Sequence, residues 1–323
     1  MMRIIRMGKR NMWYLAIVAL CVFGAGAIVT YASIPPADFP KDATMTIEKN
    51  MTLSQAADLL AKKDIIKSPV LFKAFVVMLG GNNKILAGDY LFSSAQSALR
   101  IAYRLVHGDQ GVARIKVTIP EGIASPDIAR LLAKDIPGFD SADFLKIAKP
   151  QEGYLFPDTY FFYENVTPQE VVDQMRANFN AQERKFSFAV TMSGRSEGDV
   201  VKMASILEKE ATSTTDRRII AGILWKRLAD GMPLQVDPPF FYILGKTSSQ
   251  LTVADLAVDS PYNLYKNKGL PPTPIGNPGL DAIEDALNPT ATDYWFYLAD
   301  AHGVTHYATN HEGHLANIQK YLQ

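Results

Sequence analysis

Two glutamates lie close together in an otherwise apolar helical stretch, residues 203–211 (MASILEKEA). On an α-helix, residues two apart point roughly 200° away from each other, so Glu208 and Glu210 cannot share a face. The neighbours on the Glu210 face are larger and more apolar than those on the Glu208 face: Leu207, Ile206 and Met203 against Ser205, Ala204 and Val201. Desolvation on an apolar face raises the pKa of a carboxyl group and keeps a proton available near neutral pH. Glu210 is therefore the candidate catalytic acid, and the alternative is a core-edge residue that pairs with Arg217 or Arg218.

Helical periodicity and capping signals predict two consecutive helices around these glutamates. The first covers residues 198–211. The second begins at Asp216, which has capping spacing to Ser213, and it ends before Gly231, a usual C-terminal stop. The two helices would provide the support on which the candidate acid is held.

Three later segments have the composition of loops that border binding sites. Residues 233–238 (PLQVDP) should form an ordered loop, because the proline that follows Asp237 disfavours helical geometry there. Residues 260–265 (SPYNLY) come next, and residues 269–279 (GLPPTPIGNPG) contain too many prolines and glycines for regular structure. Rigid polar loops often build binding sites, although a passive connector is the alternative. The candidate substrate contacts in these segments are Gln235, Asp237, Tyr262 and Asn263.

The N-terminus has the pattern of a membrane anchor. Four basic residues precede an uncharged stretch with an apolar core at residues 12–32, and about 20 apolar residues suffice to cross a bilayer as a helix. A cleavable signal peptide has a shorter apolar region and a small-residue cleavage site, which residues 31–34 (YASI) do not supply. Because basic residues stay on the cytoplasmic side, we expect a cytoplasmic tail at 1–11, a transmembrane helix at 12–32 and a linker at 33–43. The remainder should then lie outside the cytoplasm.

The exported part, roughly 290 residues, suggests two domains. Residues 44–111 predict the order strand, helix, helix, strand, with helices that open at Thr52 and Ser68. This order resembles the LysM module, which binds peptidoglycan-like glycans, and a structural spacer is the alternative. Residues 112–323 begin with a strand at 116–119 and a helix at 125–134. The predicted class is α+β throughout, with a LysM-like subdomain and a larger mixed catalytic domain.

Composition and histidine spacing exclude several kinds of function. Lys plus Arg and Asp plus Glu both number 33, so no net charge attracts nucleic acid. Cys21, inside the predicted membrane segment, is the only cysteine, which excludes internal disulfides and cysteine-based zinc sites. Four histidines near the C-terminus lack the spacing of a metalloprotease helix, and Gly313 is expected to interrupt any helix there. We expect a structural role for His306 and His314, and neither a metal nor a cofactor.

Several motifs together resemble one known family, the endolytic murein transglycosylases or YceG-like family. The motifs occur in the family's order: residues 152–160 (EGYLFPDTY), 204–210 (ASILEKE), 234–238 (LQVDP), Tyr262-Asn263, 269–272 (GLPP), and His306-Tyr307 with His314. With the order of anchor, LysM-like region and catalytic domain, the resemblance covers nearly the whole chain. The resemblance implies a single-pass protein of the bacterial inner membrane with a periplasmic catalytic domain. It places the family's catalytic glutamate on Glu210. The sequence departs from the family at Pro239, where a small or hydroxyl residue is more usual, and this leaves the role of residue 239 open.

The resemblance also implies a reaction and its partners. Enzymes of this family cut nascent peptidoglycan strands internally and leave 1,6-anhydro-N-acetylmuramoyl ends, and membrane-bound peptidoglycan synthases are expected partners. One carboxyl group can act first as acid and then as base, with Gln235 and Asp237 binding substrate or orienting Glu210. Two alternatives stay open: a hydrolase that uses Asp237 as a second carboxylate, and a non-catalytic cell-wall scaffold. The glycan length, the cleavage register and the oligomeric state are not determined by the sequence.

Overall fold

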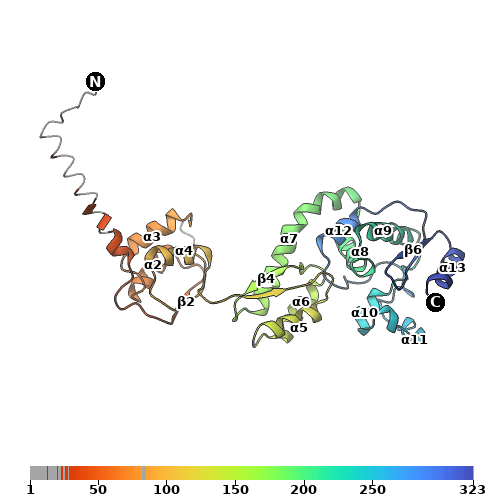
Figure 1. Cartoon of the computed structure of the whole chain (residues 1–323), viewed down its shortest axis with the longest axis horizontal. Coiled ribbons are helices and arrows are strands. Elements are labelled where there is room, and N and C mark those ends of the chain that lie inside the picture. The colour runs from red at the N-terminus through yellow and green to blue at the C-terminus, as the bar shows by residue number, and fades with distance from the viewer. Residues whose placement is uncertain are drawn as a thin grey trace, which may run out of the picture. The chain divides into compact units, whose positions relative to one another are not determined.

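The computed structural model describes residues 13, 20, 23–24, 26–27, 29–81 and 85–322. The predicted cytoplasmic tail, and most of the predicted transmembrane helix, lie outside these residues. Within the described part of the chain, no helix is both long and apolar enough to cross a membrane. The chain divides into two compact units, Met1–Ala113 and Arg114–Gln323 (Figure 1). Helices and short strands together give the mixed α+β class that the sequence predicts.

The first unit follows the predicted strand–helix–helix–strand order. Its elements are β1 (Ala43–Ile47), α2 (Leu53–Lys62), α3 (Pro69–Met78), β2 (Gly88–Phe92) and α4 (Ala98–His107). The side chains of Thr52, Ser68 and Ser97 accept hydrogen bonds from the first turns of α2, α3 and α4. The two strands pair antiparallel, with Met45 opposite Tyr90, and their inner side chains pack on the three helices in one hydrophobic core.

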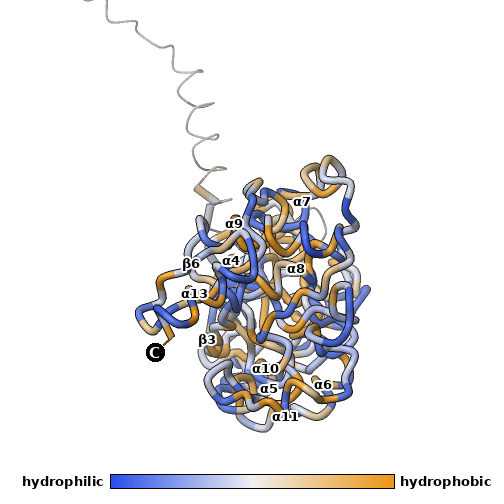
Figure 2. Tube along the Cα trace, turned by 90° about the vertical axis from the view of Figure 1, so that its right-hand side faces the viewer, coloured by the Kyte–Doolittle hydropathy of each residue, from blue (hydrophilic) through white to orange (hydrophobic). Residues whose placement is uncertain are grey.

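The second unit contains the candidate site. Its elements are β3 (Ile115–Thr118), α5 (Ser125–Asp135), α6 (Ser141–Ala148), η1 (Lys149–Gln151), β4 (Thr159–Phe162), α7 (Pro168–Ser193), α8 (Glu197–Glu210), α9 (Thr214–Ala229), α10 (Pro238–Leu244), η2 (Ser248–Gln250), α11 (Val253–Leu256), α12 (Leu280–Leu287), β5 (Phe296–Ala299), β6 (Thr305–Ala308) and α13 (His311–Tyr321). Strands β3 and β4 form one antiparallel pair and β5 and β6 another. Most of its helices carry both hydrophobic and hydrophilic residues (Figure 2), which is the pattern of helices that cover a core.

Helix α7 connects the two hydrophobic cores of this unit. Its first half contributes Val171 and Met175 to a core with β3, β4, α5 and α6. Its second half contributes Phe179 and Phe186 to a core that is centred on α8 and closed by α9 and α12. A capping box between Thr167 and its third helical residue starts the helix. Because one continuous helix contributes side chains to both cores, it fixes the position of the α8 core relative to the smaller core.

The structure corrects two expectations about local conformation. Asp237 has helical dihedral angles (φ −82°, ψ −31°), and α10 begins at the proline that follows it. Prolines suit the first turn of a helix, where the backbone N–H groups have no intrahelical acceptor, so Pro238 and the buried Pro239 open this helix rather than prevent it. Gly313 lies inside the first turn of α13, where its N–H donates to the capping side chain of Asn310 at 2.8 Å.

Candidate functional site

Glu210 is the last residue of α8, and side chains from several other segments surround its carboxyl group. Tyr297 of β5 hydrogen-bonds to it, and the charges of Asp237 and Arg227 act on it. Burial raises the pKa of Glu210 to about 7; the Tyr297 hydrogen bond and the charge of Arg227 lower it, and repulsion from Asp237 raises it further. The predicted direction of the shift is therefore confirmed. A carboxyl group that titrates near pH 7 can both donate and accept a proton in one reaction cycle.

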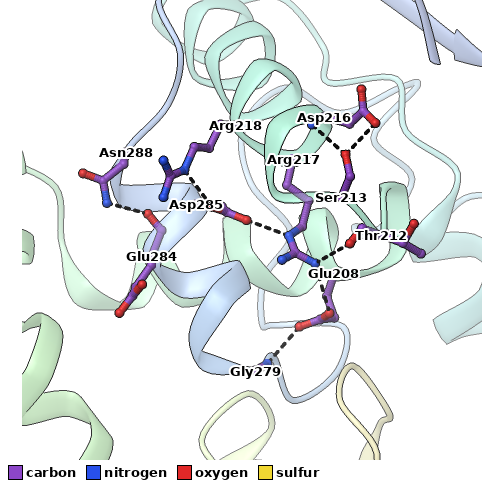
Figure 3. Close-up of polar contacts among 10 residues, drawn as sticks. All are labelled: Glu208, Thr212, Ser213, Asp216, Arg217, Arg218, Gly279, Glu284, Asp285 and Asn288. Atoms are coloured by element: carbon purple, nitrogen blue, oxygen red, sulfur yellow. Dashed lines mark hydrogen bonds and ion pairs between the residues drawn. The ribbon is translucent and has the colours of Figure 1, made fainter. Parts of the chain in front are cut away.

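Glu208 lies in a charged network that joins α8 to α9 and α12 (Figure 3). Its Oε2 accepts a hydrogen bond from the Gly279 N–H at 2.9 Å, and its Oε1 lies 4.0 Å from Nη1 of Arg217. The Nε of Arg217 donates to Asp285 at 2.7 Å, and the Nε of Arg218 donates to the same carboxylate at 2.8 Å. The basic partner that the alternative interpretation gave to Glu210 therefore lies beside Glu208.

The predicted contrast between two faces of α8 is wrong. The helix is buried around most of its circumference, from Val200 through Leu207 apart from Lys202, and the side chain of Glu208 is only 10% exposed. Burial raises the pKa of Glu208 as well, and the hydrogen bond from Gly279 opposes that rise. The two glutamates differ instead in their partners. Glu208 is bonded to backbone and faces arginine, whereas Glu210 faces tyrosine and aspartate side chains.

Asp237 and Tyr265 form a pair beside Glu210. The Tyr265 hydroxyl donates to Oδ1 of Asp237 at 2.6 Å. Burial raises the pKa of Tyr265, and the Asp237 hydrogen bond and charge raise it further. Because the negative charge of Asp237 also raises the pKa of Glu210, the two carboxyl groups are electrostatically coupled. The structure thus brings the predicted Asp237 to the candidate acid.

Gln235 is exposed and has a left-handed backbone conformation, with φ of 51°. Its N–H donates to the Leu264 carbonyl at 2.9 Å, which fixes the segment before α10 to the 260–265 segment. A non-glycine residue in this region costs about 1–3 kcal/mol, and such strain is concentrated at functional sites. The strained backbone holds an unburied amide side chain two residues before Asp237.

Tyr262 and Asn263 have different environments although they are neighbours. The Tyr262 hydroxyl is 2.8 Å from Oγ1 of Thr273, and its ring lies 5.3 Å from that of Tyr242. Asn263 is fully buried, and its Nδ2 donates to the carbonyls of Leu256 and Val258 at 2.9 Å each. Tyr262 is half-buried, whereas the amide of Asn263 is used to shape the segment that carries Tyr262.

Sequence reasoning missed Arg227 and Tyr297. Arg227 is 4% exposed and continues the buried stripe of Ile220 and Leu224 along α9 at helical spacing. A charged residue on such a stripe is a signal that the sequence already contains. Tyr297 gives no comparable signal, because an aromatic residue in a short strand is ordinary. Only the docking of the β5–β6 hairpin beside α9 brings it to Glu210.

The Pro- and Gly-rich segment 269–279 is irregular, as predicted, and its second half is buried. Asn277 accepts hydrogen bonds from the N–H groups of Gly153 and Leu155, and it donates to the Ile123 carbonyl and to Glu152. Burial raises the pKa of Glu152 to about 7, and hydrogen bonds from Ser125 and Asn277 oppose the rise. These hydrogen bonds form a buried node that joins the segments of Ile123, Glu152 and Asn277 around the Glu152 carboxyl group.

The C-terminal histidines lie around the β5–β6 hairpin and α13. The Nε2 atom of His306 is 2.9 Å from Oδ2 of Asp300, and its ring stacks on Tyr321 at 3.5 Å. His314 stacks on Phe296 at 5.2 Å. These contacts hold α13 against the hairpin. Across the described ranges, no three His, Cys, Asp or Glu side chains come together in a way that would hold a metal ion.

A carboxyl group whose pKa is raised to about 7, flanked by tyrosines, an aspartate and a buried arginine, is the arrangement of a general acid–base enzyme. The sequence model of the YceG-like family matches residues 45–320, and the chain belongs to this family. A Bacillus subtilis (strain 168) protein named endolytic murein transglycosylase is 32% identical over 313 residues, covering 87% of this chain and 86% of that protein.

A protein of the same name from Streptococcus pneumoniae (strain D39) is 27% identical over 358 residues; the match covers 95% of this chain but 64% of the longer relative. Among solved structures, a crystal structure of a YceG-like protein from Listeria monocytogenes is similar, with 33% identity and a TM-score of 0.59. That match covers 85% of this chain and 98% of the other.

Proposed function

We propose that this chain is a membrane-anchored endolytic peptidoglycan transglycosylase with Glu210 as its catalytic acid and base. The observation that supports this most is the environment of Glu210, whose pKa is raised to about 7 by burial. Membership of the YceG-like family and the names of the relatives agree with the substrate class. The basic N-terminal tail and the apolar segment 12–32 support anchoring in the plasma membrane, with the second unit outside the cytoplasm.

The reaction needs two proton transfers at one carboxyl group. Protonated Glu210 donates its proton to the glycosidic oxygen between N-acetylmuramic acid C1 and N-acetylglucosamine, and the C1–O bond breaks. The Glu210 carboxylate then accepts the proton of the muramoyl C6 hydroxyl as that oxygen attacks C1. A 1,6-anhydro ring forms, no water is consumed and Glu210 is protonated again. The Tyr297 hydroxyl and the charge of Arg227 stabilise the carboxylate between the two steps, since both lower its pKa.

The neighbouring segments then have assigned roles. The exposed Gln235 and the half-buried Tyr262 contact the glycan, and Asp237 keeps Glu210 protonated before the reaction through its negative charge. Asn263 acts indirectly, because its buried amide fixes the segment that carries Tyr262. No cofactor enters these steps. Membrane peptidoglycan synthases are the partners that we propose for supplying nascent strands.

A hydrolase is the second candidate, because Asp237 acts on Glu210 electrostatically and is a possible second carboxylate. Its Oδ1 already accepts the Tyr265 hydroxyl at 2.6 Å, which favours an orienting role. Digestion of intact sacculi in ¹⁸O-labelled water distinguishes the two reactions. Transglycosylation yields anhydro ends without label, whereas hydrolysis yields labelled reducing ends that are heavier by one water. The Glu210→Gln variant is the negative control, and full activity in that variant would reject the proposed function.

Membrane topology is tested separately. A reporter fused after residue 323 should be active only in an assay for proteins outside the cytoplasm, and the mature protein should retain its N-terminal basic residues. A mature N-terminus near Ser33 would reject the uncleaved anchor while leaving the reaction proposal intact.

A further inference from the structure

Arg227 is a buried arginine whose donors bind backbone rather than a carboxylate. It is 4% exposed, and its Nη1 donates to the Leu234 carbonyl at 2.5 Å. Its Nε and Nη2 donate to the Trp295 carbonyl at 2.8 and 2.5 Å. Burying a charge is unfavourable unless its hydrogen bonds are satisfied. The three bonds to backbone carbonyls offset the desolvation of the Arg227 guanidinium.

The two carbonyls belong to the two segments that carry the partners of Glu210. Leu234 lies three residues before Asp237, at the start of the strained turn. Trp295 lies two residues before Tyr297, directly before β5 begins. One planar guanidinium therefore sets the distance between the aspartate segment and the tyrosine strand.

Other side-chain hydrogen bonds hold the hairpin on α9 without reaching the Leu234 segment. The Tyr307 hydroxyl donates to Asp216 at 2.5 Å, and Lys226 donates to the Thr292 carbonyl at 2.9 Å. Both join the hairpin or its preceding segment to α9, and neither reaches the segment before α10. Within the part of the chain that the structure describes, Arg227 is the side chain whose hydrogen bonds reach both segments.

We propose that Arg227 is a positioning residue that holds Asp237 and Tyr297 in place around Glu210 by tethering the Leu234 and Trp295 carbonyls. This inference rests on the proposed catalytic role of Glu210. Its central claim concerns the forked geometry and not the charge alone, because a guanidinium presents several donors in a fixed plane and an ammonium is a point charge. Displacement of catalytic groups by about 1 Å can cost a factor of about 100 in rate.

The experiment compares Arg227→Lys with Arg227→Met in the full-length protein, using kcat for glycan cleavage across the pH range. The tether predicts that both variants lose about 100-fold in kcat, at every pH. Only the methionine variant should also shift the pH dependence to higher pH, since only it removes the charge that lowers the pKa of Glu210. Full activity in Arg227→Lys would overturn the proposal, because it would reduce the role of Arg227 to charge.

Arg227→Met keeps the test decisive if the lysine variant does not fold, since an apolar side chain of similar length avoids an unpaired buried charge. A role only in setting the pKa of Glu210 predicts an undiminished kcat at pH values well below that pKa, whereas the tether predicts a loss of kcat there. Arg218→Lys on the same helix is the matched control. Arg218 bonds Asp285 and lies outside the group around Glu210, so its kcat should stay within about twofold.

A double-mutant cycle with Tyr297→Phe tests whether Arg227 acts through Tyr297. The tether predicts that the double variant is nearly as active as Arg227→Lys alone, because the lysine variant has already displaced the hydroxyl. Multiplicative losses would contradict the coupling. Failure of the proposed function is recognised separately, because Glu210→Gln would then retain activity whatever the Arg227 variants do.

Discussion

Replacing Glu210 by glutamine should abolish glycan cleavage and, at alkaline pH, make the protein more stable. Burial raises the pKa of this carboxyl group from 4.5 to about 7. The folded state therefore holds the proton more tightly than the unfolded state, and stability falls as pH rises from about 4.5 through 7. The shift corresponds to at most about 3 kcal/mol, and the partial exposure of the residue reduces the expected value to roughly 2 kcal/mol.

The glutamine side chain cannot ionise, so Glu210→Gln should exceed the wild type in free energy of unfolding by roughly 2 kcal/mol at pH 8 and match it at pH 4. Denaturant unfolding followed by tryptophan fluorescence measures this in the second unit, where Trp225 and Trp295 both lie. The difference between variant and wild type cancels the other titrating groups, including Glu152.

Glu208→Gln is the matched control for this prediction. Its side-chain oxygen can still accept the Gly279 N–H, but the carboxylate charge beside Arg217 is lost. We expect substantial residual cleavage and a stability loss of about 1 kcal/mol at neutral pH. An active Glu210→Gln with an inactive Glu208→Gln would refute the assignment of the catalytic carboxyl group. A Glu210→Gln protein that is less stable than wild type at pH 8 would refute the desolvation argument.

Three further predictions concern pH, the buried node and the strained turn. The value of kcat/KM should be constant in acid and fall as pH rises through about 7, because the first step needs protonated Glu210; a profile that rises through pH 7 would contradict this. Asn277→Ala should lower the free energy of unfolding by about 3–5 kcal/mol, since partners in two other segments lose their bonds. Asn288→Ala on the exterior should cost less than about 1 kcal/mol. Gln235→Gly should stabilise the protein by about 1 kcal/mol through relief of the positive φ and raise KM in cleavage assays; an unchanged KM would remove Gln235 from the glycan contacts.

Local sequence signals predicted the helices and strands well where the structure depends on neighbouring residues. Thr52, Ser68 and Ser213 cap helices at the expected positions, because a side chain and a backbone N–H three residues apart need no distant partner. The same local rules failed at Asp237 and Gly313. Each lies at the start of a helix, where proline and glycine cost little, and the rules for helix interiors do not apply.

The candidate acid and the direction of its pKa shift were predicted from the sequence, but the groups that set this pKa were not. The motif around Glu210 and the spacing of the two glutamates selected the residue, yet both carboxyl groups are buried and the expected difference between helix faces is absent. The tertiary structure separates them through partners that come from remote segments: Gly279 and Arg217 for Glu208, and Tyr297, Asp237 and Arg227 for Glu210. A pattern of apolar residues along the chain indicates which side chains become buried. The pKa of a buried group also depends on the charges and hydrogen-bond donors that the fold places within a few ångströms of it.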